Sequence, residues 1–413
     1  MEEHPQARFI VDTLHQHGYT AYYAGGWVRD FLLKHPSDDI DIATSAPPEV
    51  IQNLFKKTVP IGLSFGIILV IIDDRKYEVA TFRNDLEYKD GRKPSKIEYT
   101  TAEEDAKRRD FTVNGMFYDP IKEKVIDFVG GKKDLEKKVI RAIGDPNLRF
   151  KEDRLRMIRA IRLACRFHFT IEKKTQKAIY DHAAELFPSV SKERIWQEFQ
   201  KMSQFPNFRV GILMLYHYGL LTTIFPDLSY LKENEMEKRI KPMENLPRTA
   251  PTISYLLLLF EGEPLEKKLS LCEHLKLSNK EKEFILFFEK AEKLFQKEQV
   301  APIRYEWAKF YAHPLSQDCM ILHAAKLSTQ KRILFLEAQD RRKSYLEKEI
   351  ERIQNKTPVI TSAFLQKQGI KPGVSMGILL KEAELLSMNQ KIENPDEILE
   401  LLKKSPHWPN LSS

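Results

Sequence analysis

Hydrophobic and polar residues follow two different patterns along this chain, and the change comes at about Asp145. Before it, short apolar runs are bounded by glycine and acidic residues, as in residues 22–24, 40–43 and 66–72. This pattern is typical of strands joined by turns. Residues 76–83 predict a further strand that pairs back on the preceding one. We therefore expect a mixed α/β head of roughly 150 residues, the size of a common domain.

Beyond Arg149 the strand pattern ends and long amphipathic stretches take over, with apolar residues recurring every three or four positions. The clearest predicted helices cover residues 153–167, 173–186, 191–202 and 280–294. Proline-containing segments at 226, 242–251 and 358 predict breaks between helical segments. The second part of the chain is therefore expected to be an all-helical array.

Composition narrows the setting of the protein. The chain has 413 residues, a net charge of +7 and 42% hydrophobic residues, which suits a packed core and a basic face for a polyanion. Its three cysteines form no CxxC pair, so disulfides and zinc ribbons are not expected. The N-terminus lacks a signal-peptide pattern and the longest apolar runs are too short to span a bilayer. We expect a cytoplasmic protein with no membrane partner; the sequence carries no signal for its oligomeric state.

The first candidate for chemistry is an acidic pair, Asp39 and Asp41. In a strand, residues two apart project from the same face, so the two carboxylates would point to one place. Paired hard oxygen ligands suit Mg²⁺, whose remaining ligands come from water and substrate phosphate. Glu78, in the predicted strand 76–83, could complete the cluster. An exposed Asp-rich turn would look similar if this motif stood alone.

Two glycines precede the acidic pair and strengthen the phosphate interpretation. Gly25-Gly26 follows a predicted strand and precedes a predicted helix, where backbone amides can approach a phosphate closely. Arg29 would add a cation near the same phosphates. A P-loop is excluded because residues 62–66 are followed by apolar residues, and no G-x-G-x-x-G follows the first strand.

Longer motifs give a specific resemblance. GGWVRDFLLK…DDIDIAT, EVATFRND, RRDFTVNGMFYD and GDPNLRFKEDRLRMIRAIR resemble, in order, segments of the class II tRNA nucleotidyltransferase and bacterial poly(A) polymerase family. The resemblance covers the first half of the chain almost continuously. It implies an α+β fold, with a polymerase-β-like mixed-sheet nucleotidyltransferase head followed by an all-α neck, body and tail. The expected boundaries are 1–148 for the head, 149–205 for the neck, 206–300 for the body and 301–413 for the tRNA-binding tail.

The resemblance also implies roles for individual residues. Asp39 and Asp41 would bind the catalytic metals with Glu78 nearby, and Arg109 would contact the nucleotide. Asp153 and Arg156 would form a template of amino acids for the incoming base. The nucleotide-binding positions that complete the expected site are Gly25, Gly26, Arg29, Arg159 and Arg162.

Elementary chemistry supports the template. Asp153 offers only acceptors and Arg156 only donors, which matches cytosine and adenine but not uracil and guanine. Three-residue spacing makes them neighbours on one helix, although such pairs are also common surface salt bridges. The four positions 153, 156, 159 and 162 drift around the helix, so their roles should differ.

These expectations lead to an enzyme that adds CCA to tRNA 3′ ends from CTP and ATP, with Mg²⁺ as cofactor. Residues 85–94 resemble the flexible loop of complete CCA-adding enzymes, and residues 369–377 resemble the family's tail segment. A poly(A) polymerase or an A-adding enzyme on the same scaffold is the alternative. A non-catalytic RNA-binding descendant would have lost an acid or the Arg-Arg-Asp motif, and all matched positions are present. Residues 255–262 replace a phosphohydrolase His-Asp pair and predict a buried helix.

Overall fold

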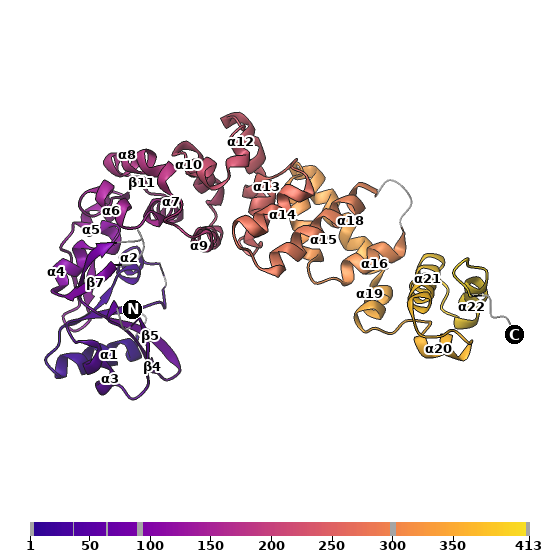
Figure 1. Cartoon of the computed structure of the whole chain (residues 1–413), viewed down its shortest axis with the longest axis horizontal. Helices are drawn as coiled ribbons and strands as arrows, with labels where there is room; N and C mark the ends of the chain where they lie inside the picture. Colours follow the sequence, from indigo (N-terminus) through magenta and orange to yellow (C-terminus); the bar gives the residue numbers. More distant parts are fainter. Residues whose placement is uncertain (1–3, 36, 63–64, 89–93, 298–302, 410–413) are drawn as a thin grey trace. The chain divides into compact units, whose positions relative to one another are not determined.

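The computed structural model describes residues 4–35, 37–62, 65–88, 94–297 and 303–409. The chain divides into two compact units, Met1–Lys238 and Arg239–Ser413, which are described separately here. In Figure 1 every strand lies in the indigo-to-magenta first unit, and the orange-to-yellow second unit is helical. The expected mixed-sheet head followed by helices is therefore confirmed; the four finer domain boundaries stay a prediction.

A seven-stranded sheet forms the core of the first unit, in the order β3-β4-β5-β2-β1-β8-β9. Only β2 and β5 pair in parallel among its neighbouring described strands, so the sheet is mixed. The strands are β1 (Ala21–Ala24), β2 (Asp41–Thr44), β3 (Thr58–Gly62), β4 (Ile67–Ile72), β5 (Arg75–Thr81), β8 (Phe117–Asp119) and β9 (Lys124–Ile126).

The predicted hairpin of β4 and β5 is confirmed, with Ile72 opposite Arg75. Asp73 and Asp74 form its turn with φ of 48° and 61°. A two-residue turn with both φ values positive matches the twist of the flanking strands, and aspartate tolerates that conformation. The turn thus fixes the register that brings β5 beside β2.

Helices and a small hairpin accompany the sheet. One hydrophobic cluster of buried residues joins Ala24, Ala43, Phe82, Ala106 and Phe117. The helices of this part are α1 (Pro5–Gln16), α2 (Gly26–Leu32), α3 (Pro48–Leu54), α4 (Ala102–Lys107) and α5 (Gly131–Glu136), with the 3-10 turn η2 (Thr112–Asn114). Strands β6 (Arg83–Tyr88) and β7 (Pro94–Tyr99) pair in a separate antiparallel hairpin.

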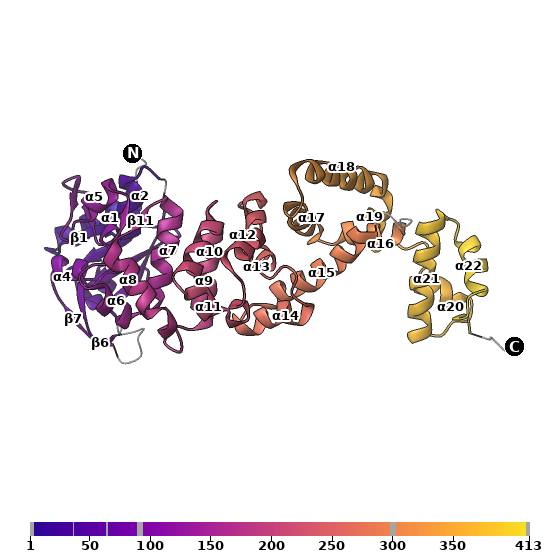
Figure 2. The same ribbon diagram turned by 90° about the horizontal axis from the view of Figure 1, so that it is seen from above.

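The rest of the first unit is helical (Figure 2). It contains α6 (Pro146–Glu152), α7 (Leu155–Phe167), α8 (Lys173–His182), α9 (Lys192–Ser203), α10 (Phe208–His217), α11 (Leu220–Ile224) and all but the last two residues of α12 (Glu233–Ile240). Between the head and these helices, β10 (Val139–Ile140) pairs in parallel with β11 (Thr170–Ile171). The expected helix 153–167 begins later than predicted, because Asp153 is extended (φ −152°, ψ 104°) and separates α6 from α7.

The second unit consists of helices α13 (Thr252–Leu259), α14 (Leu265–His274), α15 (Asn279–Gln296), α16 (Arg304–Ala312), α17 (Ser316–Ala325), α18 (Thr329–Tyr345), α19 (Glu347–Gln354), α20 (Ser362–Lys367), α21 (Val374–Gln390) and α22 (Pro395–Lys403). The apolar run at 255–260 is buried in and directly after α13, as predicted. Ser278 and Glu281 form a capping box that fixes the start of α15. Helices α20 to α22 enclose a cluster of their own, built on Ile360, Leu365, Leu379, Ile398 and Leu402.

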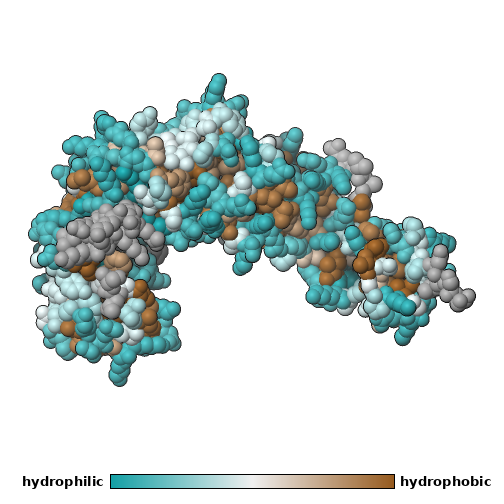
Figure 3. Space-filling view, in the orientation of Figure 1, coloured by the Kyte–Doolittle hydropathy of each residue, from teal (hydrophilic) through white to brown (hydrophobic). Residues whose placement is uncertain are grey.

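The face of the molecule in Figure 3 is mainly hydrophilic, and its apolar patches are small and separate within each unit. Among the described residues, no helix combines the length and the apolar character that crossing a membrane requires.

Candidate nucleotide and metal site

The sheet brings acidic side chains together at the start of β2. Ile42 of β2 lies opposite Val79 of β5, so Asp41 and Glu78 are adjacent on neighbouring strands. β2 begins at Asp41, and Asp39 precedes the strand, so the expectation that both aspartates share one strand is wrong. Burial, followed by the charges of Asp39 and Glu78, raises the pKa of Asp41 to about 6, while Arg109 lowers it. The carboxylates are therefore close enough to repel one another.

This repulsion is what a divalent cation would relieve. Carboxylate oxygens are the ligands that hard divalent ions prefer. Among the described residues, no three His, Cys, Asp or Glu side chains form a group that could hold a metal ion, so the expectation that Glu78 completes such a group with Asp39 and Asp41 is not confirmed. The acidic residues at β2 and β5 therefore suit an ion that takes part of its coordination from the phosphate oxygens of a substrate and from water.

Gly25 sits against this acidic cluster. Its φ of 68° and ψ of −128° at the start of α2 are rarely open to other residues. A Cβ added there would lie 3.1 Å from Nη1 of Arg109 and 4.0 Å from Oδ2 of Asp41. The structure therefore brings Gly25, Arg109 and Asp41 together, as the sequence predicted. A glycine is favoured because the backbone conformation strains any other residue and because an added Cβ would crowd Arg109.

Arg109 is held in place by Asp105, a residue that the sequence analysis missed. Nε and Nη2 of Arg109 donate to Oδ2 of Asp105 at 3.2 and 2.9 Å, and its Cζ lies 4.9 Å from the ring centre of Phe117. Arg108 donates to the other carboxylate oxygen of Asp105 at 2.8 Å. Burial opposes ionisation of Asp105, but the two arginines outweigh it and hold its pKa below the ordinary range. The spacing of three and four residues along α4 could have revealed this pairing.

Arg29 lies beside Gly26, as expected, but its side chain is buried, and its contact with phosphate stays a prediction. Arg29 is 4% exposed, its Nε donates to Asp30 at 2.9 Å, and its Nη1 donates to Oδ1 of Asn114. Its Cζ also lies 4.6 Å from the ring centre of Phe167 at the end of α7. Burial lowers the pKa of Arg29 to about 10. The donors of Arg29 are occupied by partners inside the protein. Because Arg29 lies close to Gly26, it supports the glycine turn from the side of the protein interior.

Asp153 and Arg156 each have another partner in this structure. Two nitrogens of Arg194, in α9, donate to the two oxygens of Asp153 at 3.1 and 2.7 Å. Nη1 of Arg156 bonds to Glu152 and to the carbonyl oxygen of Arg149. The expected pairing on one helix surface is wrong, because Asp153 lies between two helices. Both side chains nevertheless stand at the N-terminal end of α7, three residues apart.

The remaining arginines of α7 point in different directions, as the drift of three-residue spacing predicted. Nε of Arg159 donates to Oδ2 of Asp110 at 2.8 Å, and Asp110 raises the pKa of Arg159. Burial alone would raise the pKa of Asp110, but Arg159 and Asn114 hold it well below its usual range. Arg162 is buried and bonds to Glu198 of α9. Arg162 therefore belongs to the packing of the neck.

The predicted flexible loop 85–94 falls mostly outside the described residues, since 89–93 are not described. Its first residue, Asp85, accepts from Nε of Arg83 at 3.1 Å and from Nη1 of Arg108 at 3.4 Å. The base of the β6–β7 hairpin is therefore connected to the segment that carries Arg109.

Comparison with known proteins identifies the family. Residues 21–141 match the Poly A polymerase head domain, and residues 168–231 match the probable RNA and SrmB-binding site of polymerase A. The chain is 42% identical to the CCA-adding enzyme of Bacillus cytotoxicus over 59% of this chain and 60% of that protein. It is 35% identical to the CCA-adding enzyme of Bacillus pumilus over 81% of both. The chain belongs to the family of CCA-adding enzymes.

A solved structure agrees with this membership. The CCA-adding enzyme of Bacillus stearothermophilus in complex with CTP matches with a TM-score of 0.78 and 27% identity, over 96% of this chain and 97% of that one. Within this CCA-adding family member, the metal-site candidates and Arg109 fall in the matched head segment. Arg194 falls in the second matched segment, and the base-template candidates lie between the two.

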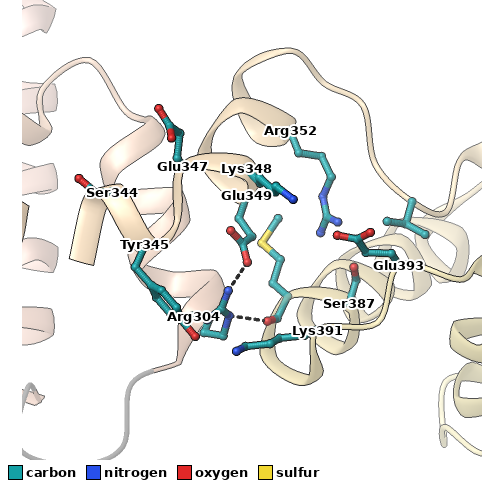
Figure 4. A pocket seen from close by; sticks show the side chains of 12 residues that line it. Arg304, Ser344, Tyr345, Glu347, Lys348, Glu349, Arg352, Ser387, Lys391 and Glu393 are labelled. Atoms are coloured by element: carbon teal, nitrogen blue, oxygen red, sulfur yellow. Dashed lines mark hydrogen bonds and ion pairs between the residues drawn. The ribbon is translucent and has the colours of Figure 1, made fainter. Parts of the chain in front are cut away.

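The second unit of this CCA-adding family member has a hollow of its own, with a cavity volume of about 560 Å³ (Figure 4). Arg304 spans it, bonding to Glu349 and donating to the carbonyl oxygen of Met388 at 3.0 Å. The pKa of Tyr345, beside Lys391 and Arg304, is lowered by hydrogen bonds from both cations. Positive and negative side chains alternate around this hollow, so it lacks the concentrated negative charge of the site in the first unit.

Proposed function

We propose that this chain adds two cytidines and one adenosine in turn to the 3′ end of tRNA. It would use CTP and ATP, release pyrophosphate, and require no nucleic-acid template. The observation that carries the proposal is the convergence of Asp41, Glu78 and Arg109 beside Gly25 in a chain of this family. Relatives named CCA-adding enzymes, one of them solved with CTP, support the choice of substrate.

A divalent metal ion serves this family, and we assign Mg²⁺ to this chain. Asp39 and Asp41 would hold it, with Glu78 beside them. The bound ion would neutralise charge on the triphosphate and pyrophosphate and lower the pKa of the attacking RNA 3′-hydroxyl. Burial and, after it, the charges of Asp39 and Glu78 raise the pKa of Asp41, and a bound cation would offset both effects, which supports this assignment.

Arg109 and the glycines would position the triphosphate. Phosphoryl transfer depends mainly on alignment and on stabilisation of negative charge, so fixed donors suit the task. Arg109 is fixed through Asp105, which takes up Nε and Nη2 and leaves Nη1 directed toward Gly25 and Asp41. Gly25 and Gly26 allow the phosphates to approach the backbone closely. These residues would align the α-phosphate with the RNA hydroxyl.

Asp153 and Arg156 would select the base. Cytosine and adenine each present an amino donor next to a ring-nitrogen acceptor, which the Asp–Arg pair can match. A carboxylate accepts about four hydrogen bonds. Arg194 and the backbone N–H of Leu155 supply three of them to Asp153, so one place stays available for the amino group of the base. Arg156 would turn from Glu152 toward the ring nitrogen when the nucleotide enters.

The helical second unit would bind the acceptor. Contacts to RNA phosphates come from lysine, arginine and exposed backbone, and they depend on salt. The segment 369–377, which leads into α21 and leaves Val374 83% exposed, is our candidate for such contacts. A-form RNA is recognised by shape, so this surface would favour the fold of tRNA over its sequence.

The decisive experiment incubates the protein with tRNA lacking its terminal CCA, with each nucleoside triphosphate alone and in combination. We expect two additions with CTP alone, a third with CTP and ATP together, and none after chelation of divalent ions. Products are resolved by gel electrophoresis at single-nucleotide resolution. Addition of A only to a CC end, or in long runs, would instead support the A-adding or poly(A) polymerase alternative.

A further inference from the structure

Two arginines of α7 reach the head from the same side of the helix. Arg159 and Arg166 are seven residues apart, which is about two turns of an α-helix, so they share a face. Nε of Arg159 donates to Oδ2 of Asp110 at 2.8 Å. Nη2 of Arg166 donates to Oδ2 of Asp30 at 3.0 Å. The helix is thus attached to the head at two points along its length.

The two attachment points are joined to each other inside the head. Arg29 donates to the other oxygen of Asp30 at 2.9 Å and, through Nη1, to Oδ1 of Asn114. The amide nitrogen of Asn114 then donates to Oδ1 of Asp110 at 3.1 Å. We call this unbroken series of hydrogen bonds the ladder; its members are Arg166, Asp30, Arg29, Asn114, Asp110 and Arg159.

The ladder is buried at its centre, where water cannot replace a lost partner. Arg29 and Asp30 are each 4% exposed, and Asn114 is 8% exposed. A buried polar group that loses its partner destabilises the fold, and the loss is larger if the group is charged. Hydrogen bonds also require particular distances and angles, whereas apolar contacts tolerate sliding. The ladder therefore favours one orientation of α7 relative to the head over slightly rotated or shifted orientations.

We propose that the ladder sets the angle of α7 against the head, and that Asn114 is a positioning residue for nucleotide selection. Two attachments on one rigid helix fix the direction of its axis, and the base-template candidates stand at its N-terminal end. The angle of α7 thus sets the distance between the base-selecting residues and the acidic site at β2. This inference rests on the proposed function of Asp153 and Arg156.

Other contacts hold the neck together without the ladder. Arg162 of α7 bonds to the buried Glu198 of α9 on another side of the helix. The amide of Asn207, the residue before α10, donates to the backbone carbonyl of Cys165 in α7 at 2.9 Å. Loss of the ladder should therefore misorient a folded neck. Asn207→Ala is a matched control, because it also removes a side-chain amide that bonds next to or within α7.

The first test compares Asn114→Ala and Arg166→Met with Asn207→Ala in steady-state CTP and ATP addition to tRNA. A misplacement of about 1 Å can cost roughly 100-fold in rate, so we expect both ladder variants to lower kcat about 10- to 100-fold. KM should change little, and discrimination against UTP should fall. Asn207→Ala should keep wild-type kcat and selectivity. Ladder variants that match Asn207→Ala in kcat and in UTP rejection would overturn the proposal.

A second measurement does not depend on activity. Spin labels at Gln16→Cys in α1 and Lys201→Cys in α9 report the head-to-neck distance, since both positions are exposed and the native cysteines are buried. We expect Asn114→Ala to broaden the distance distribution while Asn207→Ala leaves it unchanged. An unchanged distribution in Asn114→Ala would overturn the ladder. The wild-type protein could fail to extend tRNA while Asn114→Ala still broadens the distance distribution. In that case the ladder does set the angle of α7, and the proposed function is wrong.

Discussion

Replacing Arg194 with methionine should loosen the carboxylate of Asp153 without removing it. The two side chains form a fork with N–O distances of 3.1 and 2.7 Å, from residues 41 positions apart in sequence. In Arg194→Met, the backbone N–H of Leu155, at 3.0 Å, would be the one donor among the described residues that still holds the carboxylate. Methionine has a similar length and keeps apolar packing. The substitution therefore isolates the effect of the fork.

The magnitude follows from burial. Breaking a fully buried ion pair by removing one partner costs about 3–5 kcal/mol. The Arg194 and Asp153 side chains are 18% and 15% exposed, so the cost should be smaller, about 2–3 kcal/mol. For a domain of this size, Tm falls roughly 2–4 °C per kcal/mol, which gives a decrease of about 4–12 °C. If half of that energy also orients the base, the preference for CTP over UTP should fall about tenfold.

Two assays separate stability from selectivity. Thermal unfolding measures the change in Tm, and kcat/KM for CTP and UTP with the same tRNA measures the preference. The matched control is Arg154→Met, because Arg154 bonds to Glu185 in the same segment and has no described bond to Asp153. The control should lose some stability and keep its preference. Arg194→Met with reduced Tm and wild-type rejection of UTP would refute the positioning role.

Two further predictions concern the head. Asp41→Asn should abolish transfer yet raise Tm at pH 7.5 in thermal scans without metal. The pKa of Asp41 is raised from 3.8 to about 6, so its negative charge disfavours the folded state above pH 6. The gain in Tm should therefore vanish as the pH falls toward 4. A Tm gain that persists at pH 4 would contradict this reasoning. Gly25→Ala should cost about 1–3 kcal/mol and raise KM for nucleotides, since its Cβ would crowd Arg109. Gly130→Ala, with φ of 79° and no atom within 4 Å, should cost stability but leave KM unchanged.

Local patterns predicted the framework of the site correctly. The hairpin of β4 and β5 follows from two apolar runs and an Asp-Asp turn between them, and it carries Glu78. Gly25 could be recognised from the sequence because glycine is the residue type that readily adopts a positive φ, which this turn requires. The break at Asp153 was missed, although Asp145 and Pro146 mark an N-cap and first turn that begin a separate short helix before it.

Partners distant in sequence could not be predicted from spacing. Asp153 lies 41 residues from Arg194, and Arg159 lies 49 residues from Asp110. A guanidinium pairs with whichever carboxylate the fold brings near. The spacing of residues in a single sequence does not reveal which carboxylate that is. The helical spacing of the α7 arginines therefore indicated that their roles differ, but not which of them turn inward. The partner of Arg29 could not be predicted for the same reason, because Asn114 is 85 residues away.

The apolar cluster shared by α20, α21 and α22 is drawn from residues 359–408, and polar contacts such as that of Arg304 with Met388 join this segment to the rest of the second unit. A segment whose apolar side chains are satisfied among themselves can be exchanged between relatives at little cost to the remainder. Natural variation in this segment could therefore accumulate independently of the acidic residues and arginines of the head. Recognition of the RNA body and the chemistry at its 3′ end would then evolve at separate rates within one polypeptide. Chimeras joined just before Val359 would keep this cluster whole and would test that independence, provided that the contact of Arg304 with the backbone of residue 388 is kept.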